Sequence, residues 1–302
     1  MSLKAVITNI SRCSLHDGPG SRTVIYFKGC ALRCRWCHNP ETLSPQKQLL
    51  YLPQKCIGCG RCVALCPQQH IVEANKMTLL RAGCTLCGKC ADSCPTGALS
   101  LCGEEKTVAE LLAEIEKDSH YYQATGGGVT FSGGECLLHP DFLAELARSC
   151  IEKGIHTAVE TALFVPWSNV ENLLPYIRLF YADLKIADPE KHREYTEKDN
   201  RLILDNLRRL SETAENIIVR IPVIPTVNDT TEDFAGFADI LRTLGKGVQK
   251  VELLRYNHLA KSKYDILGAE YHSFSDEPQS ERQMKQYADC LSDASGLPCC
   301  FG

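Results

Sequence analysis

The sequence predicts an α/β fold, in which a domain of parallel strands and helices is interrupted by a small cysteine-rich segment. Alternation of short apolar runs with amphipathic helical segments is typical of a parallel sheet with right-handed crossovers. Between the first and second runs, residues 50–103 break this alternation and carry two copies of a four-cysteine pattern. The six predicted strands are Thr23–Phe27, Val129–Phe131, His156–Glu160, Leu179–Asp183, Ile217–Ile224 and Val251–Leu254.

Composition limits the class of protein. The chain has 302 residues, of which 44% are hydrophobic and 23% charged, so it can bury a full core. A formal net charge of -4, without any basic tract, gives no general case for binding nucleic acid or an anionic membrane. No apolar run approaches the roughly 20 residues of a membrane span, and the N-terminus lacks a signal-peptide pattern. We therefore expect a cytoplasmic protein.

The chain contains eighteen cysteines, which would indicate disulfides in a short secreted protein. Here eleven of them stand in metal-ligand spacings within a long chain. The other seven follow no such spacing, and we expect them to be small buried hydrophobes. They are Cys13, Cys102, Cys136, Cys150, Cys290, Cys299 and Cys300. The sequence offers no explanation for the adjacent pair near the end.

The first metal-ligand set follows the first predicted strand. A turn, His16-Asp17-Gly18-Pro19-Gly20, precedes that strand, and Cys30, Cys34 and Cys37 follow it. Three thiolates at this C-x3-C-x2-C spacing can ligate three irons of a 4Fe-4S cluster and leave the fourth iron open. A structural zinc loop is the alternative, but zinc sites usually complete four ligands with paired units, and His38 is too close to be the fourth. The spacing favours the cluster.

The second set is the repeated pattern of residues 50–103. Both copies read C-x2-C-x2-C-x3-C-P, the run found in bacterial ferredoxins, where the fourth cysteine ligates the other cluster. Two clusters tied crosswise would staple a segment that has few large apolar residues. Two zinc knuckles are the alternative, but they do not predict this ending twice. The predicted ligand sets are Cys56, Cys59, Cys62 and Cys94 for one cluster, and Cys84, Cys87, Cys90 and Cys66 for the other.

Beyond the cysteine-rich segment, Thr107 predicts the start of a helix with apolar residues at helical spacing. Polar clusters then follow three predicted strands: Ser132-Gly133-Gly134-Glu135, Glu160-Thr161 and Asp183-Leu184-Lys185. Because chemistry in barrels of parallel strands gathers at the carboxyl ends of the strands, these clusters are candidate site residues.

Together these motifs resemble those of the radical S-adenosylmethionine (SAM) enzymes. Within that superfamily, the DGPG turn and the double ferredoxin run resemble glycyl-radical-enzyme activating proteins, the group of pyruvate formate-lyase activating enzyme. The resemblance implies a partial (β/α)6 TIM-like barrel with an inserted ferredoxin-like domain holding two 4Fe-4S clusters. The predicted domains are 1–49, the first part of the barrel; 50–103, the insert; and 104–302, the rest of the barrel.

The resemblance also implies roles for single residues. Cys30, Cys34 and Cys37 would hold the catalytic cluster, whose open iron binds SAM. Asp17 would help to position the target backbone, and Trp36 would pack near the adenine, although an ordinary core aromatic is the alternative. The GGE turn would receive the methionyl amine, and the DLK pair would surround the SAM carboxylate. The implied SAM contacts are Trp36, His38, Ser132, Gly133, Gly134, Glu135, Glu160, Asp183, Lys185 and Asn257.

Two positions depart from the family pattern. Ala162-Leu163 replace the small pair that commonly follows the Glu-Thr motif, which leaves the shape of that turn open. Asn257 stands where the pyruvate formate-lyase activating enzyme has a histidine, and His258 comes one step later. Neighbouring residues of a strand or turn point in different directions, so His258 cannot simply take over the role. Asn257 is the predicted contact, with His258 as the second candidate.

The implied function is that of a radical SAM activase. A ferredoxin or flavodoxin would pass an electron through the inserted clusters to the catalytic cluster, and SAM would be cleaved to methionine and a 5'-deoxyadenosyl radical. That radical would take a hydrogen atom from one glycine of a large partner enzyme. Two alternatives stay open: a radical SAM enzyme acting on a small molecule, and an electron-transfer protein in which the third cluster is only a relay. The sequence does not name the partner.

Overall fold

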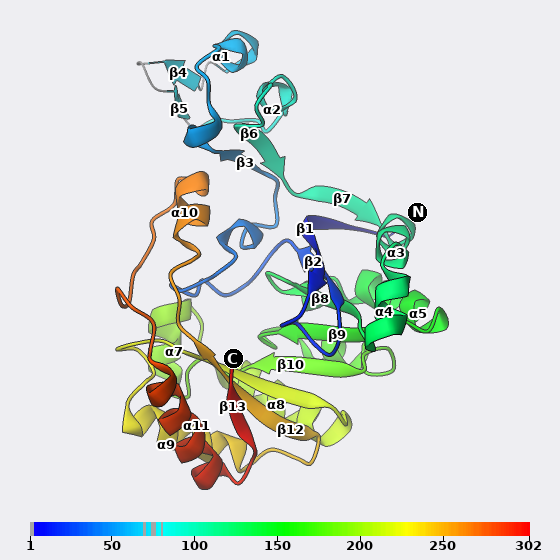
Figure 1. The fold of residues 1–302 in the computed structure, drawn as a ribbon, viewed down its shortest axis with the longest axis vertical. Coiled ribbons are helices and arrows are strands. Elements are labelled where there is room, and N and C mark those ends of the chain that lie inside the picture. Colours follow the sequence, from blue (N-terminus) through cyan, green and yellow to red (C-terminus); the bar gives the residue numbers. More distant parts are fainter. Residues whose placement is uncertain (1–2, 69–70, 74–76, 80) are drawn as a thin grey trace.

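A nine-stranded sheet forms the body of the protein in the computed structural model, which describes residues 3–68, 71–73, 77–79 and 81–302 (Figure 1). The strand order is β13-β12-β11-β10-β9-β8-β2-β1-β7. All neighbours from β2 to β13 are parallel, whereas β1 pairs antiparallel with both β2 and β7. In the described residues the end strands β13 and β7 do not pair, so the sheet is open.

All six predicted strands are present, and the mostly parallel sheet is confirmed. Five of the six, β12 being the exception, have largely buried sequences because helices cover the sheet, and such strands read as nearly continuous apolar runs. Their bounds are β2 (Arg22–Phe27), β8 (Gly128–Gly133), β9 (His156–Thr161), β10 (Leu179–Asp183), β11 (Ile217–Val223) and β12 (Val248–Arg255).

Three strands of the sheet were not predicted. They are β1 (Lys4–Ser14), β7 (Glu104–Thr107) and β13 (Cys299–Phe301), which lie at or near the two ends of the sheet. The strand β13 accounts for the adjacent pair Cys299 and Cys300. Successive side chains of a strand point to opposite faces, and accordingly the first is half-buried against the core while the second is exposed.

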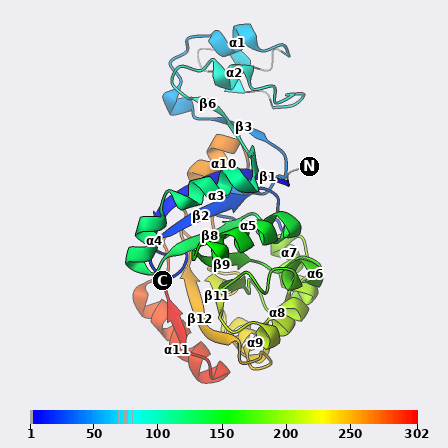
Figure 2. The same ribbon diagram turned by 90° about the vertical axis from the view of Figure 1, so that its right-hand side faces the viewer.

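Helices follow the strands, and most of them cover the outer side of the curved sheet, whereas the helix at residues 261–267 lies beside the cysteine-rich segment (Figure 1, Figure 2). Thr107 caps the first of them through a capping box with Glu110, as the sequence predicts. The main hydrophobic core lies between these helices and the sheet. The helices are α3 (Val108–Glu116), α4 (Ser119–Thr125), α5 (Pro140–Glu152), α6 (Trp167–Glu171), α7 (Pro189–Thr196), α8 (Arg201–Thr213), α9 (Thr231–Leu241), α10 (Lys261–Leu267) and α11 (Glu281–Ser295).

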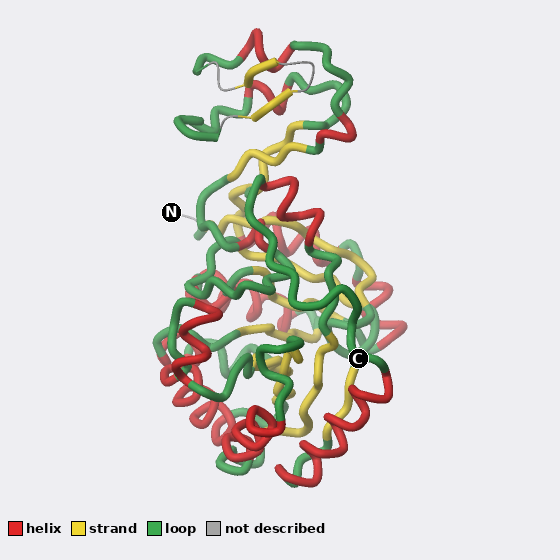
Figure 3. The backbone as a smooth tube through the Cα atoms, turned by 90° about the vertical axis from the view of Figure 1, so that its left-hand side faces the viewer, coloured by secondary structure: helices red, strands yellow, loops and turns green. Residues whose placement is uncertain are grey.

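The cysteine-rich segment lies beyond one end of the sheet and has its own small apolar cluster (Figure 3). Its stem is the antiparallel pair β3 (Gln48–Tyr51) and β6 (Leu99–Cys102). The stem carries the helices α1 (Arg61–Leu65) and α2 (Lys89–Asp92) and a second pair of strands, β4 (Ile71–Glu73) and β5 (Met77–Leu79). The predicted insert, 50–103, includes residues 69–70, 74–76 and 80, which lie outside the described residues.

The seven cysteines that belong to no motif differ in how far they are buried. Cys102, Cys136 and Cys150 are buried, as predicted. The prediction is wrong for Cys13, Cys290 and Cys300, which are exposed on β1, α11 and β13. These elements cover the body with one face and leave the other in solvent, so burial there depends on the direction of the side chain. Within the described residues, no helix has both the length and the apolar character needed to cross a bilayer.

Candidate active site and cysteine cavities

The loop of Cys30, Cys34 and Cys37 follows β2 at the carboxyl edge of the sheet. Several neighbours fix its backbone. Gly29 N donates to Thr42 O at 2.7 Å, and Arg33 N donates to Thr196 O, at the end of α7, at 2.9 Å. From α10, the Tyr264 hydroxyl donates to Cys37 O at 3.1 Å. The loop is therefore held from three sides before any ligand binds.

The three thiols are desolvated. Burial raises the pKa of Cys30 and of Cys37 to about 12, and burial also raises the pKa of Cys34 above its ordinary value. The charge of Lys185 acts on all three in the opposite direction. Buried thiols of this kind give up their protons when a cation takes their place, so metal binding would release protons. Three thiols beside one lysine fit the cluster that the spacing predicts.

No three His, Cys, Asp or Glu side chains of the described residues are arranged to hold a single metal ion.

The turn Ser132–Glu135 follows β8 and packs against the start of the cysteine loop. Gly133 has a φ of +116°, and a Cβ there would lie 2.3 Å from the backbone of Phe27. A Cβ on Gly134 would lie 2.2 Å from Gly29 O. Only glycine permits such close contact between two backbones, so the GG pair joins the end of β8 to the end of β2.

Glu135 is only 2% exposed, and its carboxylate accepts hydrogen bonds from three donors. Thr161 Oγ1 lies 2.8 and 3.0 Å from its two oxygens, Ala162 N 3.0 Å and Leu137 N 3.2 Å. Burial raises the pKa of Glu135 to about 7. The side chain thus faces the turn after β9 and ties it to the turn after β8. The two residues that depart from the family pattern, Ala162 and Leu163, lie in this turn, where Ala162 N donates to Glu135 and Leu163 N donates to Thr161 Oγ1.

A second buried network surrounds Arg220 on β11. Its guanidinium donates to Glu160, to Glu252 Oε2 at 3.0 Å and to the backbone oxygen of His16 at 2.9 Å, and it lies 3.6 Å from the ring centroid of Tyr181. Glu160 also accepts from Ser132 Oγ at 2.5 Å. One side chain therefore connects three strands with the turn of Asp17.

Sequence reasoning left Arg220 out of the candidate site. Two signals were available: Arg220 opens the stretch 220–225, which resembles the family, and it stands inside an otherwise apolar strand, where a buried charge needs partners.

Asp17 lies in the turn between β1 and β2. Ser14 Oγ donates to its carboxylate, and Thr130 Oγ1 of β8 donates to its backbone oxygen at 2.7 Å. The guanidinium of Arg22 reaches Pro19 O at 3.4 Å. The turn is thus fixed against β8 and β11, close to the Glu160 and Arg220 network.

Asp183 ends β10, and Lys185 Nζ donates to its Oδ2 at 2.7 Å. Burial lowers the pKa of Lys185, but Asp183 and the Cys34 thiol outweigh burial and raise it above the ordinary value. Lys185 is therefore a cation at neutral pH, beside the cysteine loop.

His38 contacts the backbone of Asn257, and burial lowers the pKa of the imidazole while this hydrogen bond opposes the shift. Asn257 is half-buried, whereas His258 is exposed. The structure thus places Asn257, rather than His258, against the cysteine loop. Trp36 is buried, with ring centroids 6.3 Å from Tyr195 and 6.1 Å from Phe274. Its contacts within the chain are those of a core aromatic.

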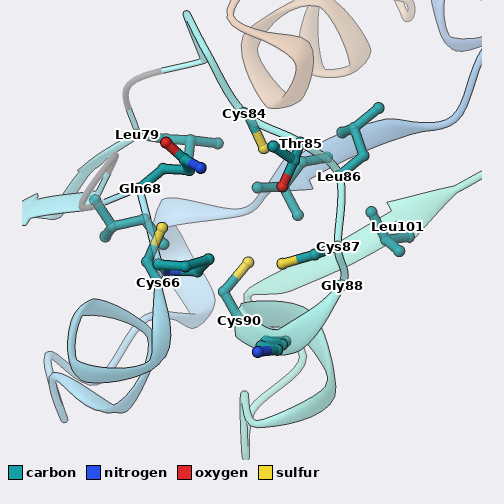
Figure 4. Close-up of a pocket in the computed structure, with 14 residues that line it drawn as sticks. Cys66, Gln68, Leu79, Cys84, Thr85, Leu86, Cys87, Gly88, Cys90 and Leu101 are labelled. Atoms are coloured by element: carbon teal, nitrogen blue, oxygen red, sulfur yellow. The ribbon is translucent and has the colours of Figure 1, made fainter.

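The eight cysteines of the insert gather into two cavities. In one of them the sulfur atoms of four cysteines are directed into a shared space (Figure 4). Each cavity takes three cysteines from one run and the fourth from the other run, the same crossed sets as those inferred from the spacing. The first is lined by Cys66, Cys84, Cys87 and Cys90, and the second by Cys56, Cys59, Cys62 and Cys94.

Comparison with other proteins identifies the family. The profile described as "Radical SAM superfamily" matches residues 24–238. The (2S)-3-sulfopropanediol dehydratase activating enzyme of Klebsiella oxytoca is 42% identical over 98% of this chain and 96% of its own length. The choline trimethylamine-lyase activating enzyme of Oleidesulfovibrio alaskensis is 40% identical over 95% of each chain. The trans-4-hydroxy-L-proline dehydratase activating enzyme of Clostridioides difficile is 39% identical over 94% of this chain and 95% of its own length.

Solved structures agree on the fold. Streptococcus suis SuiB bound to its precursor peptide superimposes with a TM-score of 0.56 at 12% identity, over 92% of this chain and 48% of that one. A radical SAM methyltransferase from Sphaerobacter thermophilus superimposes with a TM-score of 0.55 at 13% identity, over 98% of this chain and 76% of that one. At these identities the likeness shows the fold alone. The profile and the full-length relatives together show that the chain belongs to the radical SAM superfamily and, within it, to the activating enzymes of glycyl radical enzymes.

Proposed function

We propose that this protein generates a glycyl radical on a partner enzyme by reductive cleavage of SAM. The observation that carries the proposal is the loop of the half-buried Cys30, Cys34 and Cys37, which lies beside the cation of Lys185 and the GG turn at one edge of the sheet. Relatives of about 40% identity over nearly the full chain are named activating enzymes, which supports a protein as the substrate.

Cys30, Cys34 and Cys37 would hold a 4Fe-4S cluster, which when reduced would supply the one electron needed to split SAM into methionine and a 5'-deoxyadenosyl radical. The chain's own residues would bind SAM and orient it. Lys185, held by Asp183, is placed to pair with the SAM carboxylate, since a charge-assisted hydrogen bond favours that partner. The backbone at Gly133 and Gly134 is placed to receive the methionyl amine. Hydrogen-atom abstraction needs neither acid nor base, so the walls of the site serve to exclude water and oxygen.

Asp17 is proposed to position the backbone of the target glycine. Its turn is fixed by Thr130 and, through His16 O, by Arg220, so the carboxylate is presented from a rigid support. The remaining proposed SAM contacts are Trp36, His38, Ser132, Glu135, Glu160 and Asn257.

The insert is proposed to be a ferredoxin-like domain that carries two further 4Fe-4S clusters and passes electrons from a ferredoxin or flavodoxin. The two four-cysteine cavities with crossed ligand sets support this proposal, because four thiolates around one space are the usual ligands of such a cluster. Reduced clusters react with air, so an oxygen-free cytoplasm is the proposed setting, without a nucleic-acid or membrane partner.

The test is anaerobic mixing of the reconstituted protein with SAM, a reductant and candidate glycyl radical enzymes, followed by electron paramagnetic resonance. We expect a glycine-centred signal with one of them. Cys34→Ala should abolish both this signal and the release of 5'-deoxyadenosine, because two cysteines cannot hold the cluster. Cys290→Ala, which changes an exposed cysteine outside every motif, should leave both unchanged. Full activity of Cys34→Ala would end the proposal.

A further inference from the structure

The two cysteine cavities follow one another along the stem of the insert. Leu49 and its cross-strand partner Leu101 line the cavity of Cys66, Cys84, Cys87 and Cys90. Tyr51, two residues further along β3, contacts Cys56 of the other cavity. Side chains two apart on a strand share a face and lie about 6.6 Å apart along it. The cavities therefore lie in sequence along this face.

The start of β3 is tied to the body of the protein. Lys28, buried at the end of β2, donates to Gln48 Oε1 at 2.8 Å. The cavity at Leu49 is therefore the one nearer to the body, and the cavity at Tyr51 is the one further away. We name them the near cavity (Cys66, Cys84, Cys87, Cys90) and the far cavity (Cys56, Cys59, Cys62, Cys94).

Arg81 connects the near cavity to the catalytic loop. Its guanidinium donates to Leu49 O and, at 2.8 Å, to Ile266 O of α10. It also lies close enough to Cys84 for the thiol to act on its pKa, which burial lowers and Cys84 raises. The same helix α10 carries Tyr264, whose hydroxyl donates to Cys37 O. A continuous path of hydrogen bonds and chain thus runs from the near cavity to the cysteine loop.

The surface around the far cavity exposes apolar and basic side chains. Ile57 is 67% exposed and Leu65 is 48% exposed, and the side chains of Lys55, Cys59 and Arg61 are exposed around them. Residues 53–68 and 94–98, which include every residue that lines this cavity, contain no Asp or Glu. In the described part of the chain no carboxylate pairs with Lys55 or Arg61. A chain of net charge -4 thus carries a basic and apolar surface here.

We propose that electrons enter at the far cavity and that the surface of Lys55, Ile57, Arg61 and Leu65 docks an acidic one-electron donor protein. This inference rests on the proposed function. Opposite charges steer association of such a pair, and a small apolar centre with a charged rim suits a transient complex. In each encounter the donor is oxidised by one electron and one inserted cluster is reduced by one electron, with no group transferred between the proteins.

The test uses the reconstituted holoenzyme and a strongly acidic, reduced flavodoxin in anaerobic stopped flow, with flavin absorbance as the readout. The double variant Lys55→Glu/Arg61→Glu should slow electron transfer at least tenfold at low salt and flatten its dependence on ionic strength. It should also weaken binding of the oxidised flavodoxin in calorimetry by a similar factor. Arg282→Glu/Lys285→Glu, an equal double charge reversal on the exposed face of α11, should change neither quantity.

The variant Lys89→Glu distinguishes electron entry at the near cavity from entry at the far cavity, because Lys89 lines the near cavity and is exposed. Slower transfer in this variant with normal transfer in the double variant would overturn the proposal, as would equal rates in all variants. Iron content and the dithionite-reduced spectrum should match the parent, which excludes loss of the clusters. A glycine radical that still forms with dithionite would leave the proposed function intact even where the docking surface is wrong, whereas no radical with either reductant would contradict the proposed function.

Discussion

Buried cations of this protein each hold together parts of the chain that are distant in sequence. Arg22, fully buried at the start of β2, donates to Thr130 Oγ1 at 2.7 Å and faces His156 Nδ1 at 3.3 Å. Arg220 likewise spans Glu160 and Glu252. A buried charge is costly when a partner is lost, so these contacts fix the relative positions of neighbouring strands. The charge of such a cation also changes the pKa of titratable side chains beside it, as Arg22 does for His156.

His156 should make the protein less stable in mild acid. Burial, followed by the charges of Arg22 and Arg178, lowers the pKa of His156 from 6.5 to about 4. Between these values the unfolded chain binds a proton that the folded protein does not, so stability is lost as the pH falls through this window and is present above it. Allowing for its partial exposure, we expect a loss of about 1–2 kcal/mol between pH 7 and pH 5.

Urea unfolding under anaerobic conditions at several pH values measures this loss. His156→Gln keeps an acceptor for Arg22 but cannot titrate, so its curve should be flatter than that of the parent. Subtracting the two curves cancels the contribution of the cysteines. His120→Gln, on the exposed face of α4, should retain the parental slope. A parental slope in His156→Gln would show that the acid sensitivity arises elsewhere.

Among the elements, the junction of β2 with β8 positions most of the candidate site. Both strands end at this edge, where Gly134 N donates to Phe27 O at 2.9 Å and Glu135 N donates to Gly29 O at 2.7 Å. The cysteine loop leaves from one strand and the GGE turn from the other. Their spacing is therefore set by backbone contact rather than by side chains, and a single added methyl group should disturb it.

Gly133→Ala should destabilise the protein by roughly 3 kcal/mol, since it combines a strained positive φ with a Cβ against the backbone of Phe27. Gly154→Ala is the matched control: its φ is also positive, at +72°, but a Cβ there meets nothing within 4 Å, so only the backbone cost of about 1 kcal/mol applies. Unfolding free energies and SAM binding by calorimetry measure both. Equal costs at the two glycines, or unchanged SAM binding in Gly133→Ala, would contradict this account of the junction.

The whole molecule combines local motifs, which a sequence displays, with tertiary contacts, which it does not. The six covered strands have apolar runs of their own, and the cysteine spacings lie within single loops, so both could be predicted. The strands β7 and β13 could not, because short or polar sequences such as Glu104–Thr107 become strands only where an edge is available for pairing. The strand β1 does have a β-rich run with Val6, Ile7 and Ile10, which the sequence reasoning missed.

The same limit applied to the site. Arg220 stands 60 residues from Glu160 and 32 from Glu252, and no local pattern links them. The relative position of insert and body was equally invisible, because it depends on contacts between residues distant in sequence, such as those of Arg81 with Leu49 and Ile266 and that of Lys28 with Gln48.

Loss of Arg81 should loosen the insert from the body without unfolding either part. The insert keeps its own apolar cluster and its cysteine cavities, but β3 and α10 lose the guanidinium that bonds to both. In Arg81→Ala we expect unchanged iron content, faster hydrogen exchange in β3 and α10, and slower glycine-radical formation with flavodoxin than with dithionite, which can reduce the catalytic cluster directly. Lys89→Ala, on the outer side of the near cavity, should leave exchange in α10 unchanged. If exchange in α10 is unaltered in Arg81→Ala, the insert is held by other contacts, such as that of Lys28 with Gln48.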